Sequence, residues 1–206
     1  MSFTLTIDDE LASGFVRLRL HDMTTEKFWQ FAKDNQQIRI EMTMDGELIV
    51  YSPTGGGSGY SNNNLLYEIT AWARRDGSGV VFDSSTLFVL PNGAKRSPDA
   101  AWVTKTRWDA LSDEEKEKPV PFAPDFAAEI LSPTDSLTET QAKMEEYKAN
   151  GVRLGWLIDR KVRKVYVYRP GTTDPETLND PATVFGDPEL PGFVLDTSQV
   201  FVPRSP

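Results

Sequence analysis

The chain has 206 residues, a formal net charge of −9 and no cysteine. This length allows one domain with a substantial core, and we predict a single domain over residues 1–206. The lack of cysteine excludes disulfides, thiolate catalysis and cysteine-based zinc sites, and the acidic balance argues against indiscriminate binding to nucleic acid.

No apolar run approaches the roughly 18 residues needed to span a bilayer. The N-terminus is acidic early and lacks the basic-then-apolar layout of a signal peptide. We therefore expect a cytoplasmic protein without a membrane partner. The single histidine, His21, lies in a polar stretch and is expected to be a solvated surface residue. Any bound metal would then be hard and held by oxygen, meaning Mg²⁺, Mn²⁺ or Ca²⁺.

The first part of the chain predicts a helix and a hairpin. Residues 1–20 are weakly patterned and indicate a loose arm or an edge strand. Thr24 or Thr25 can cap a helix that runs to about Asp34, with apolar side chains on one face. Strand-like alternation on both sides of Asp45-Gly46 predicts a β-hairpin.

Residues 54–59, T-G-G-G-S-G, follow the hairpin and predict a plain flexible connection. Glycine-rich loops can cradle phosphate, but the Gly-Lys-Ser/Thr ending of a P-loop is missing here. A helix is predicted over residues 61–75. Its buried stripe contains Leu65, Leu66, Ile69, Trp72 and Ala73, and Asn62 falls on the same face.

The middle of the chain predicts short strands and a surface excursion. Strands at 80–82 and 86–90 precede a turn at Asn92-Gly93. Pro98 then opens another strand, of which Asp99 is the first full member. Polar residues 104–124 indicate an excursion with a short helix, for which Ser112 and Glu115 provide the cap.

A βαβ unit is the strongest local pattern. An apolar strand at 126–131 leads into a helix that ends at Asn150, and Ser136 with Glu139 forms its capping box. Gly151 suits the left-handed position after the helix. An apolar strand at 155–158 completes a unit of the usual size, with a right-handed crossover.

The pattern of the rest of the chain predicts one more strand and includes basic residues that could contact nucleic acid. The strand at 165–168 pairs back through the Arg160-Lys161 turn, and a Pro- and Gly-rich segment follows. Lys95-Arg96 and the basic cluster at 160–164 could form a local path for nucleic acid. Either segment is more often an ordinary solvated turn.

Glu129 interrupts a buried strand and needs a chemical explanation. Together with Asp99 from a neighbouring strand it could bind a divalent metal, and the carbonyl of Ile130 can add a third oxygen. Such a metal would polarise a phosphodiester and generate hydroxide from bound water. Lys143 and Gln141 lie at opposite margins of the buried face of the next helix, where both could reach the Glu129 strand. The Lys143 ammonium would orient the water or stabilise the pentacovalent charge.

Each residue also has a structural interpretation when taken alone. Pro98-Asp99 could be an ordinary loop dipeptide, Glu129 could face solvent from an edge strand, and Lys143 could be a surface lysine. The three together, on a strand, a second strand and a helix, favour a site.

Several segments resemble the Uma-type endonuclease family. They are S-P-D-A-A-W-V, P-D-F-A-A-E-I-L-S-P-T-D-S, Q-A-K-M-E-E-Y-K-A-N-G-V-R-L-G-W-L-I-D and L-P-G-F-V-L-D. The likeness covers the chain from about Phe28 to Phe201. The family is placed in the PD-(D/E)XK nuclease superfamily, so the resemblance implies a mixed α/β core, here about 36–170, and Mg²⁺-dependent cleavage of DNA.

The resemblance carries over to single positions. Pro98-Asp99 resembles the P-D element, and Glu129 resembles the acidic residue of (D/E)XK. Leu131 stands where that motif has its lysine. The resemblance implies that the lysine has moved into the following helix, where Lys143 is the match and Gln141 its companion.

A further acid from the first core helix is common in this superfamily. Glu68 could serve, although close relatives would more readily place the acid at the position of Asn64. Glu41 in the hairpin is another candidate for an outer carboxylate. The sequence leaves the choice open.

We therefore predict an α/β fold of the PD-(D/E)XK nuclease type. A mixed sheet is flanked by the 61–75 and 137–150 helices, with an N-terminal helix-hairpin and a C-terminal strand extension. The predicted function is Mg²⁺- or Mn²⁺-dependent endonucleolytic hydrolysis of DNA.

In this prediction, Asp99, Glu129 and the Ile130 carbonyl bind the metal, while Lys143 and Gln141 complete the site. Two alternatives remain: a non-catalytic binding or assembly module with a nuclease fold, and a small-molecule phosphoesterase. Cutting both strands of a duplex usually calls for two active sites, so a homodimer is expected from the mechanism.

Overall fold

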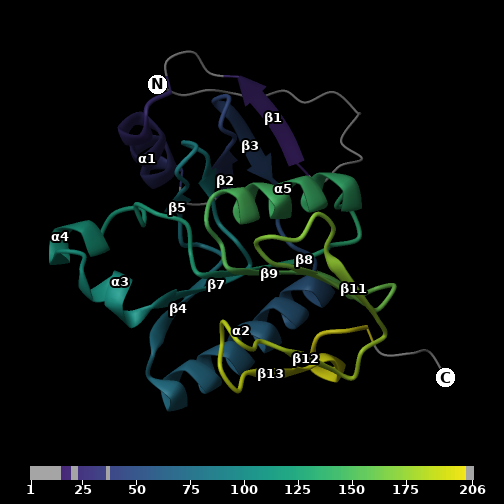
Figure 1. Ribbon diagram of the computed structural model, residues 1–206. Helices are drawn as coiled ribbons and strands as arrows, with labels where there is room; N and C mark the ends of the chain where they lie inside the picture. Colours follow the sequence, from purple (N-terminus) through teal and green to yellow (C-terminus); the bar gives the residue numbers. More distant parts are fainter. Residues whose placement is uncertain (1–14, 20–22, 36–37, 203–206) are drawn as a thin grey trace.

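The computed structural model describes residues 15–19, 23–35 and 38–202. His21 and residues 1–14 of the predicted arm lie outside these ranges. Helices cover both faces of the larger of two main sheets (Figure 1). None of the described helices combines the length and the apolar character needed to cross a membrane.

The larger sheet has six strands in the order β11-β10-β9-β8-β7-β4. They are β4 (Gly79–Asp83), β7 (Ala100–Thr104), β8 (Phe126–Ile130), β9 (Leu154–Asp159), β10 (Lys164–Tyr168) and β11 (Glu176–Asn179). Strands β8 and β9 are parallel and are joined by helix α5 (Leu137–Ala149), whereas the other neighbours are antiparallel. The predicted mixed sheet and βαβ unit are confirmed. Since β8 is central, Glu129 is not an edge-strand residue facing solvent.

Local sequence explains where α5 begins and ends. The Ser136 side chain accepts a hydrogen bond from the backbone N–H of Glu139, which is one half of the predicted capping box. The Glu139 carboxylate pairs with Arg17 instead of reaching back to the Ser136 backbone, so the box is not completed. Gly151 adopts a left-handed conformation with φ 100° after the helix, which glycine does without steric cost. Met144 and Tyr147 on the buried face of α5 belong to the core between this helix and the sheet.

The predicted hairpin is present but belongs to a second sheet, with strand order β1-β3-β2-β6-β5. Its strands are β1 (Phe15–Arg19), β2 (Arg39–Met42), β3 (Glu47–Tyr51), β5 (Phe88–Val89) and β6 (Lys95–Arg96). The N-terminal helix-hairpin was predicted, and the structure adds that β6 pairs with the edge of β2 and extends the hairpin into a separate sheet. Helix α1 (Thr25–Asp34), which Thr24 caps as predicted, packs on this sheet through Phe28.

Helix α2 (Gly56–Asp76) begins five residues earlier than predicted and includes most of the glycine-rich stretch, which was expected to be a plain connection. Glycine is a poor helix former, so local propensity argues against this start. Tertiary contacts outweigh it, because Ser58 and Ser61 are buried and the Ser61 hydroxyl bonds the carbonyl of Val200. A smaller correction concerns Asp99, which immediately precedes β7 instead of opening it.

Two remaining segments follow the predictions. The excursion contains α3 (Lys105–Asp109) and α4 (Asp113–Lys116), and Ser112 and Glu115 form the predicted capping box. The C-terminal extension contains β12 (Thr183–Phe185), β13 (Val194–Asp196) and the 3-10 turn η1 (Thr197–Gln199).

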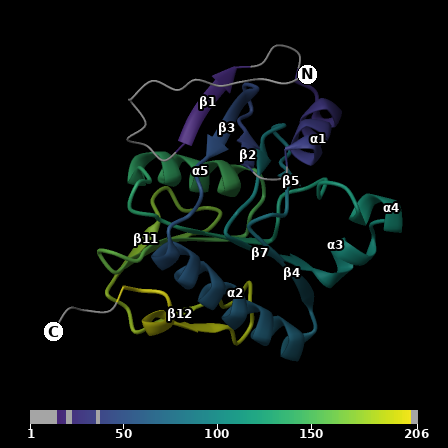
Figure 2. The same ribbon diagram turned by 180° about the vertical axis from the view of Figure 1, so that it is seen from behind.

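The larger sheet separates two parts of the core. Helix α2 and the C-terminal extension (β12, β13 and η1) lie on one face, and α5 lies on the other (Figures 1 and 2). Alternation along β8 directs Phe126, Ala128 and Ile130 toward α2 and Ala127 toward α5. Glu129 shares the face of Ala127, so its carboxylate is directed to the α5 side.

Candidate active site

Strand register brings Asp99 and Glu129 together. Strands β7 and β8 pair antiparallel, with Ala100 opposite Ala128. One more step of this register places Asp99 opposite Glu129. The backbone N–H of Ile130 donates to Oδ2 of Asp99 at 2.8 Å, which fixes the aspartate beside the β8 strand. Both carboxylates are about 6% exposed.

Helix α5 supplies two partners for Glu129, one turn apart. The Lys143 ammonium lies 2.7 Å from Oε1 of Glu129, and the Tyr147 hydroxyl donates to the same oxygen at 3.0 Å. Residues four apart share one face of a helix, so both side chains face the sheet. Oε2 of Glu129 has no hydrogen-bond or ion-pair partner within the described residues.

The second sheet closes the site from the opposite side. Ile40 and Met42 of β2 face the core under α1, so Arg39 and Glu41 face the larger sheet. Arg39 Nη1 lies 3.1 Å from Oδ1 of Asp99. The Lys143 ammonium lies 2.8 Å from Oε1 of Glu41 and therefore bridges Glu41 and Glu129.

Glu41 is a fully buried counter-ion with both oxygens engaged. Besides Lys143, Oε1 accepts the backbone N–H of Ser97 at 3.1 Å. Oε2 accepts the Tyr51 hydroxyl at 3.0 Å and Arg96 Nη1 at 3.2 Å. Its side chain has no exposed surface and does not line the cleft. These contacts indicate that Glu41 holds the surrounding cations in place, and they leave it little capacity for a metal.

The electrostatics of the site follow from burial and from these ion pairs. Burial lowers the pKa of Lys143, but Glu129 and Glu41 outweigh burial and raise it above its usual value. Lys143 is therefore an ammonium that can donate hydrogen bonds but cannot take up a proton. Burial raises the pKa of Glu129 to about 7, against the opposing effect of Lys143. A nearby cation favours the ionised form of such a carboxylate.

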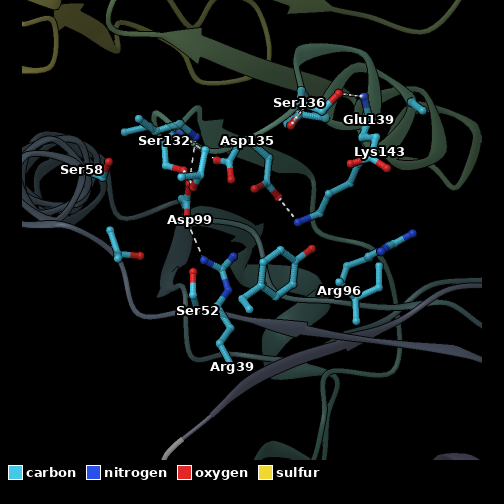
Figure 3. Close-up of a pocket in the computed structure, with 18 of the residues that line it drawn as sticks. Arg39, Ser52, Ser58, Arg96, Asp99, Ser132, Asp135, Ser136, Glu139 and Lys143 are labelled. Carbon is cyan, nitrogen blue, oxygen red and sulfur yellow. Dashed lines mark hydrogen bonds and ion pairs between the residues drawn. The ribbon is translucent and has the colours of Figure 1, made fainter. Parts of the chain in front are cut away.

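These groups border an open cleft of about 580 Å³ between the two sheets and the first turns of α2 and α5. Figure 3 shows Arg39 and Asp99 facing each other in this cleft, with the Lys143 side chain directed toward them. The predicted residues Asp99, Glu129, Ile130 and Lys143 all line it. Lys95-Arg96 is buried and does not form the surface path that was considered for nucleic acid.

The other candidates lie elsewhere. Gln141 is half-buried on α5 and is not among the residues that line the cleft. Glu68 is also absent from the lining, and the Asn64 amide bonds the carbonyl of Gln199 in the C-terminal segment. Helix α2 instead presents Asn62, whose Oδ1 is buried without a hydrogen-bond partner among the described residues.

Sequence reasoning did not identify Arg39, Tyr51 and Tyr147 as members of the site. Tyr147 had a detectable signal, because it lies four residues after Lys143 on the same helical face. Arg39 and Tyr51 stand directly opposite each other in the hairpin. No local pattern indicated that this face of the hairpin would meet the βαβ unit.

The donor set fits a hard divalent metal. The described residues contain no group of three acidic, histidine or cysteine side chains that could hold a metal. Asp99 and Glu129 nevertheless offer two adjacent carboxylates, one with an unengaged oxygen. Mg²⁺ is usually bound by one or two carboxylates, with water and substrate phosphate oxygens completing its coordination.

Comparison with known proteins places the chain in a family. Residues 25–198 match the Uma2 family model, described as "Putative restriction endonuclease". The fold is similar to the crystal structure of a putative nuclease of DUF820 from Anabaena variabilis. That likeness has a TM-score of 0.73 and 20% sequence identity, over 87% of this chain and 97% of that one. No curated protein matches the chain. Because the family model spans most of its length, the chain belongs to the Uma2 family.

Proposed function

We propose that this protein is a metal-dependent endonuclease that hydrolyses phosphodiester bonds in DNA. The observation that carries the proposal is the meeting of Asp99, Glu129 and Lys143 in one open cleft. Two carboxylates and one ammonium are the groups that metal-assisted phosphoryl transfer requires. Family membership and the shared fold support the same reaction.

Asp99, Glu129 and the Ile130 carbonyl would hold Mg²⁺ or Mn²⁺. A bound ion supplies Lewis acidity toward the phosphate and a more acidic water molecule. Lys143 cannot act as a base while it is protonated, so its role is to orient the attacking water and stabilise negative charge. Tyr147 holds Oε1 of Glu129, which leaves Oε2 for the ion. Gln141, half-buried on the same helix as Lys143, would support the geometry of the site from outside the cleft lining.

One observation favours the non-catalytic alternative. Asp99 is paired with Arg39, and Glu129 with Lys143, so the acids are already neutralised without a metal. A purely structural ion-pair network would show the same pairs. Metal binding and turnover therefore have to be measured separately.

The test combines calorimetry with plasmid cleavage. Wild type is expected to bind Mn²⁺ and to convert supercoiled plasmid, whereas Asp99→Asn and Glu129→Gln lose both properties by at least about a hundredfold. Lys143→Met is expected to lose cleavage while remaining folded. Glu139→Gln is the matched control, because Glu139 lines the same cleft but pairs with Arg17.

The outcomes separate the candidate functions. Cleavage that survives Asp99→Asn unchanged would eliminate this mechanism. Mn²⁺ binding without cleavage of any nucleic acid would support the binding module, and hydrolysis of small phosphodiesters alone would support the phosphoesterase. A linear product rather than a nicked circle would agree with two active sites acting together in a homodimer.

A further inference from the structure

Arg39 projects from β2 into the cleft, next to the carboxylates proposed to bind the metal. Its Nη1 lies 3.1 Å from Oδ1 of Asp99. Its Nη2 donates to the carbonyl of Ser97 at 2.5 Å and lies 3.8 Å from Oε1 of Glu41. In Figure 3 the guanidinium is directed at Asp99. The cation nearest to Asp99 within the described residues is therefore an arginine side chain.

The guanidinium of Arg39 is only partly satisfied. Its Nε is buried and has no hydrogen-bond partner within the described ranges, and its side chain is 28% exposed. Arg96, the neighbouring arginine, is 8% exposed and binds Glu146 through Nε at 2.6 Å and Glu41 through Nη1. A guanidinium carries five donors in a fixed fork. Arg39 is thus held less completely than Arg96, and it borders open space into which it can move.

Charge balance makes Arg39 the group that a divalent ion would displace. The buried cluster contains four carboxylates and three cations and so carries one net negative charge; these are Glu41, Asp99, Glu129 and Glu146, with Arg39, Arg96 and Lys143. A divalent ion would make the cluster net positive. Lys143 and Arg96 each contact two carboxylates at 3.2 Å or less. Arg39 has one such contact, to Asp99, because its second carboxylate, Glu41, is 3.8 Å away, and its side chain is the most exposed of the three. Arg39 is therefore the cation most readily released.

We propose that Arg39 stands in for the divalent cation in the metal-free protein and moves to a phosphate of the DNA substrate when the cation binds. This role presupposes the proposed metal-dependent nuclease. The contact with Arg39 holds the Asp99 carboxylate in place beside β8 while no metal is bound. Once released, a guanidinium can hold two phosphate oxygens at the same time, for which its planar fork is suited.

Substitution of Arg39 should have opposite effects on metal binding and on cleavage. Arg39→Met retains an apolar stem but removes the charge that competes with the cation. Mn²⁺ affinity, measured by calorimetry without DNA, is expected to rise about tenfold because repulsion between neighbouring cations is removed. Plasmid cleavage at saturating Mn²⁺ is expected to fall at least about tenfold, because a charged phosphate contact is lost.

Two further variants make the comparison specific. Arg17→Met removes the same charge from the lining of the same cleft, but Arg17 pairs with Glu47 and Glu139. Its Mn²⁺ affinity is expected to stay within about twofold of wild type, because an exposed charge is well screened. Arg39→Gln keeps a donor for Asp99 without the charge, and it provides the same test if the methionine variant does not fold.

The results distinguish this inference from the proposed function. Weaker or unchanged Mn²⁺ binding by folded Arg39→Met and Arg39→Gln would show that Arg39 only orients Asp99, and would overturn the inference. Tighter binding with undiminished cleavage would overturn the transfer to phosphate. If wild type and both variants neither bind Mn²⁺ nor cut DNA, the proposed function itself fails, and this role fails with it.

Discussion

Buried charges at this site fall into two groups by their contacts. Glu41 has every oxygen engaged and no exposed surface, whereas Glu129 has one oxygen without a partner within the described residues and lines the cleft. Burying a carboxylate is unfavourable unless it is paired or binds a cation. Glu41 satisfies this condition within the protein, while Glu129 satisfies it only in part. The two glutamates should therefore respond differently to neutralisation.

Neutralising Glu41 is expected to destabilise the fold in a pH-dependent way. Burial alone would raise its pKa, but Lys143, Arg96 and Arg39 lower it from 4.5 to about 2. The ionised form thus stabilises the folded state above pH 4.5, and this contribution disappears as the pH falls toward 2. Glu41→Gln should lose on the order of 3 kcal/mol at pH 7, and about two fifths of that difference should be gone by pH 3.5.

Urea unfolding of Glu41→Gln and wild type at pH 7, 5 and 3.5 measures this difference. Glu139→Gln is the control, because its ion pair with Arg17 is partly exposed and such pairs contribute about 1 kcal/mol or less. A loss of stability in Glu41→Gln that is the same at all three pH values would contradict the assignment.

At the scale of single elements, the site depends on how strands and helices are positioned. Pairing of β7 with β8 sets Asp99 beside Glu129, and the docking of α5 on the sheet sets Lys143 above them. Strand β4 pairs along the full length of β7 and fixes its outer side. A change that forces β4 away from β7 should therefore disturb β7, the strand that directly follows Asp99.

Gly79 at the start of β4 provides such a change. A Cβ there would lie 2.3 Å from the backbone oxygen of Val103 and 2.3 Å from the Trp102 ring. Gly79→Ala is expected to destabilise the protein by about 2–3 kcal/mol, because neither the backbone nor the buried indole can give way. Thermal and urea unfolding measure this loss.

Gly59 in the first turns of α2 is the matched control, since a Cβ there meets nothing within 4 Å. Gly59→Ala should stabilise the protein by about 0.5–1 kcal/mol through helix propensity. Two substitutions of the same chemistry are thus expected to change stability in opposite directions. Equal effects would show that contact at β4 is not the cause.

At the scale of the whole molecule, the two sides of the larger sheet differ: one borders the cleft of the candidate site, and the other is covered by packed segments. The cleft lies on the α5 side, where the second sheet faces it. The other side is covered by α2 and the C-terminal extension (Figure 2). This extension contributes Leu190, Phe193 and Leu195 to the core. Both sides of the sheet contain buried core residues, but the cleft borders only the α5 side.

Truncation of Phe193 should affect stability but not the cleft. Phe193 is 2% exposed and stacks on Trp156 with ring centroids 5.6 Å apart. Phe193→Ala is expected to lower the free energy of unfolding by about 3–5 kcal/mol, because it leaves a cavity in the core. Mn²⁺ affinity of the folded variant at low temperature should match wild type, since the substitution lies across the sheet from the cleft. An affinity change of tenfold or more would contradict this expectation.

Local sequence was sufficient to predict the helices and turns whose formation depends on residues close in the chain. The capped helix after Ser136, the left-handed Gly151 and the hairpin at Asp45-Gly46 were all predicted, because caps, turns and periodicity act over a few residues. The βαβ unit then placed Glu129 and Lys143 on adjoining surfaces. The family resemblance to Uma-type proteins is confirmed by the Uma2 match.

The tertiary structure alone decided what surrounds these residues. Lys143 pairs with Glu41 across 102 positions of sequence, and Arg39 reaches Asp99 across 60. These contacts exist because the hairpin joins a second sheet, which its local pattern could not indicate, since the free edge of β2 can pair with any compatible strand. The start of α2 at Gly56 has a similar origin in contacts with the distant C-terminal segment. The sequence by itself thus determined which residues could carry the chemistry, and only long-range packing determined which charges oppose and orient them.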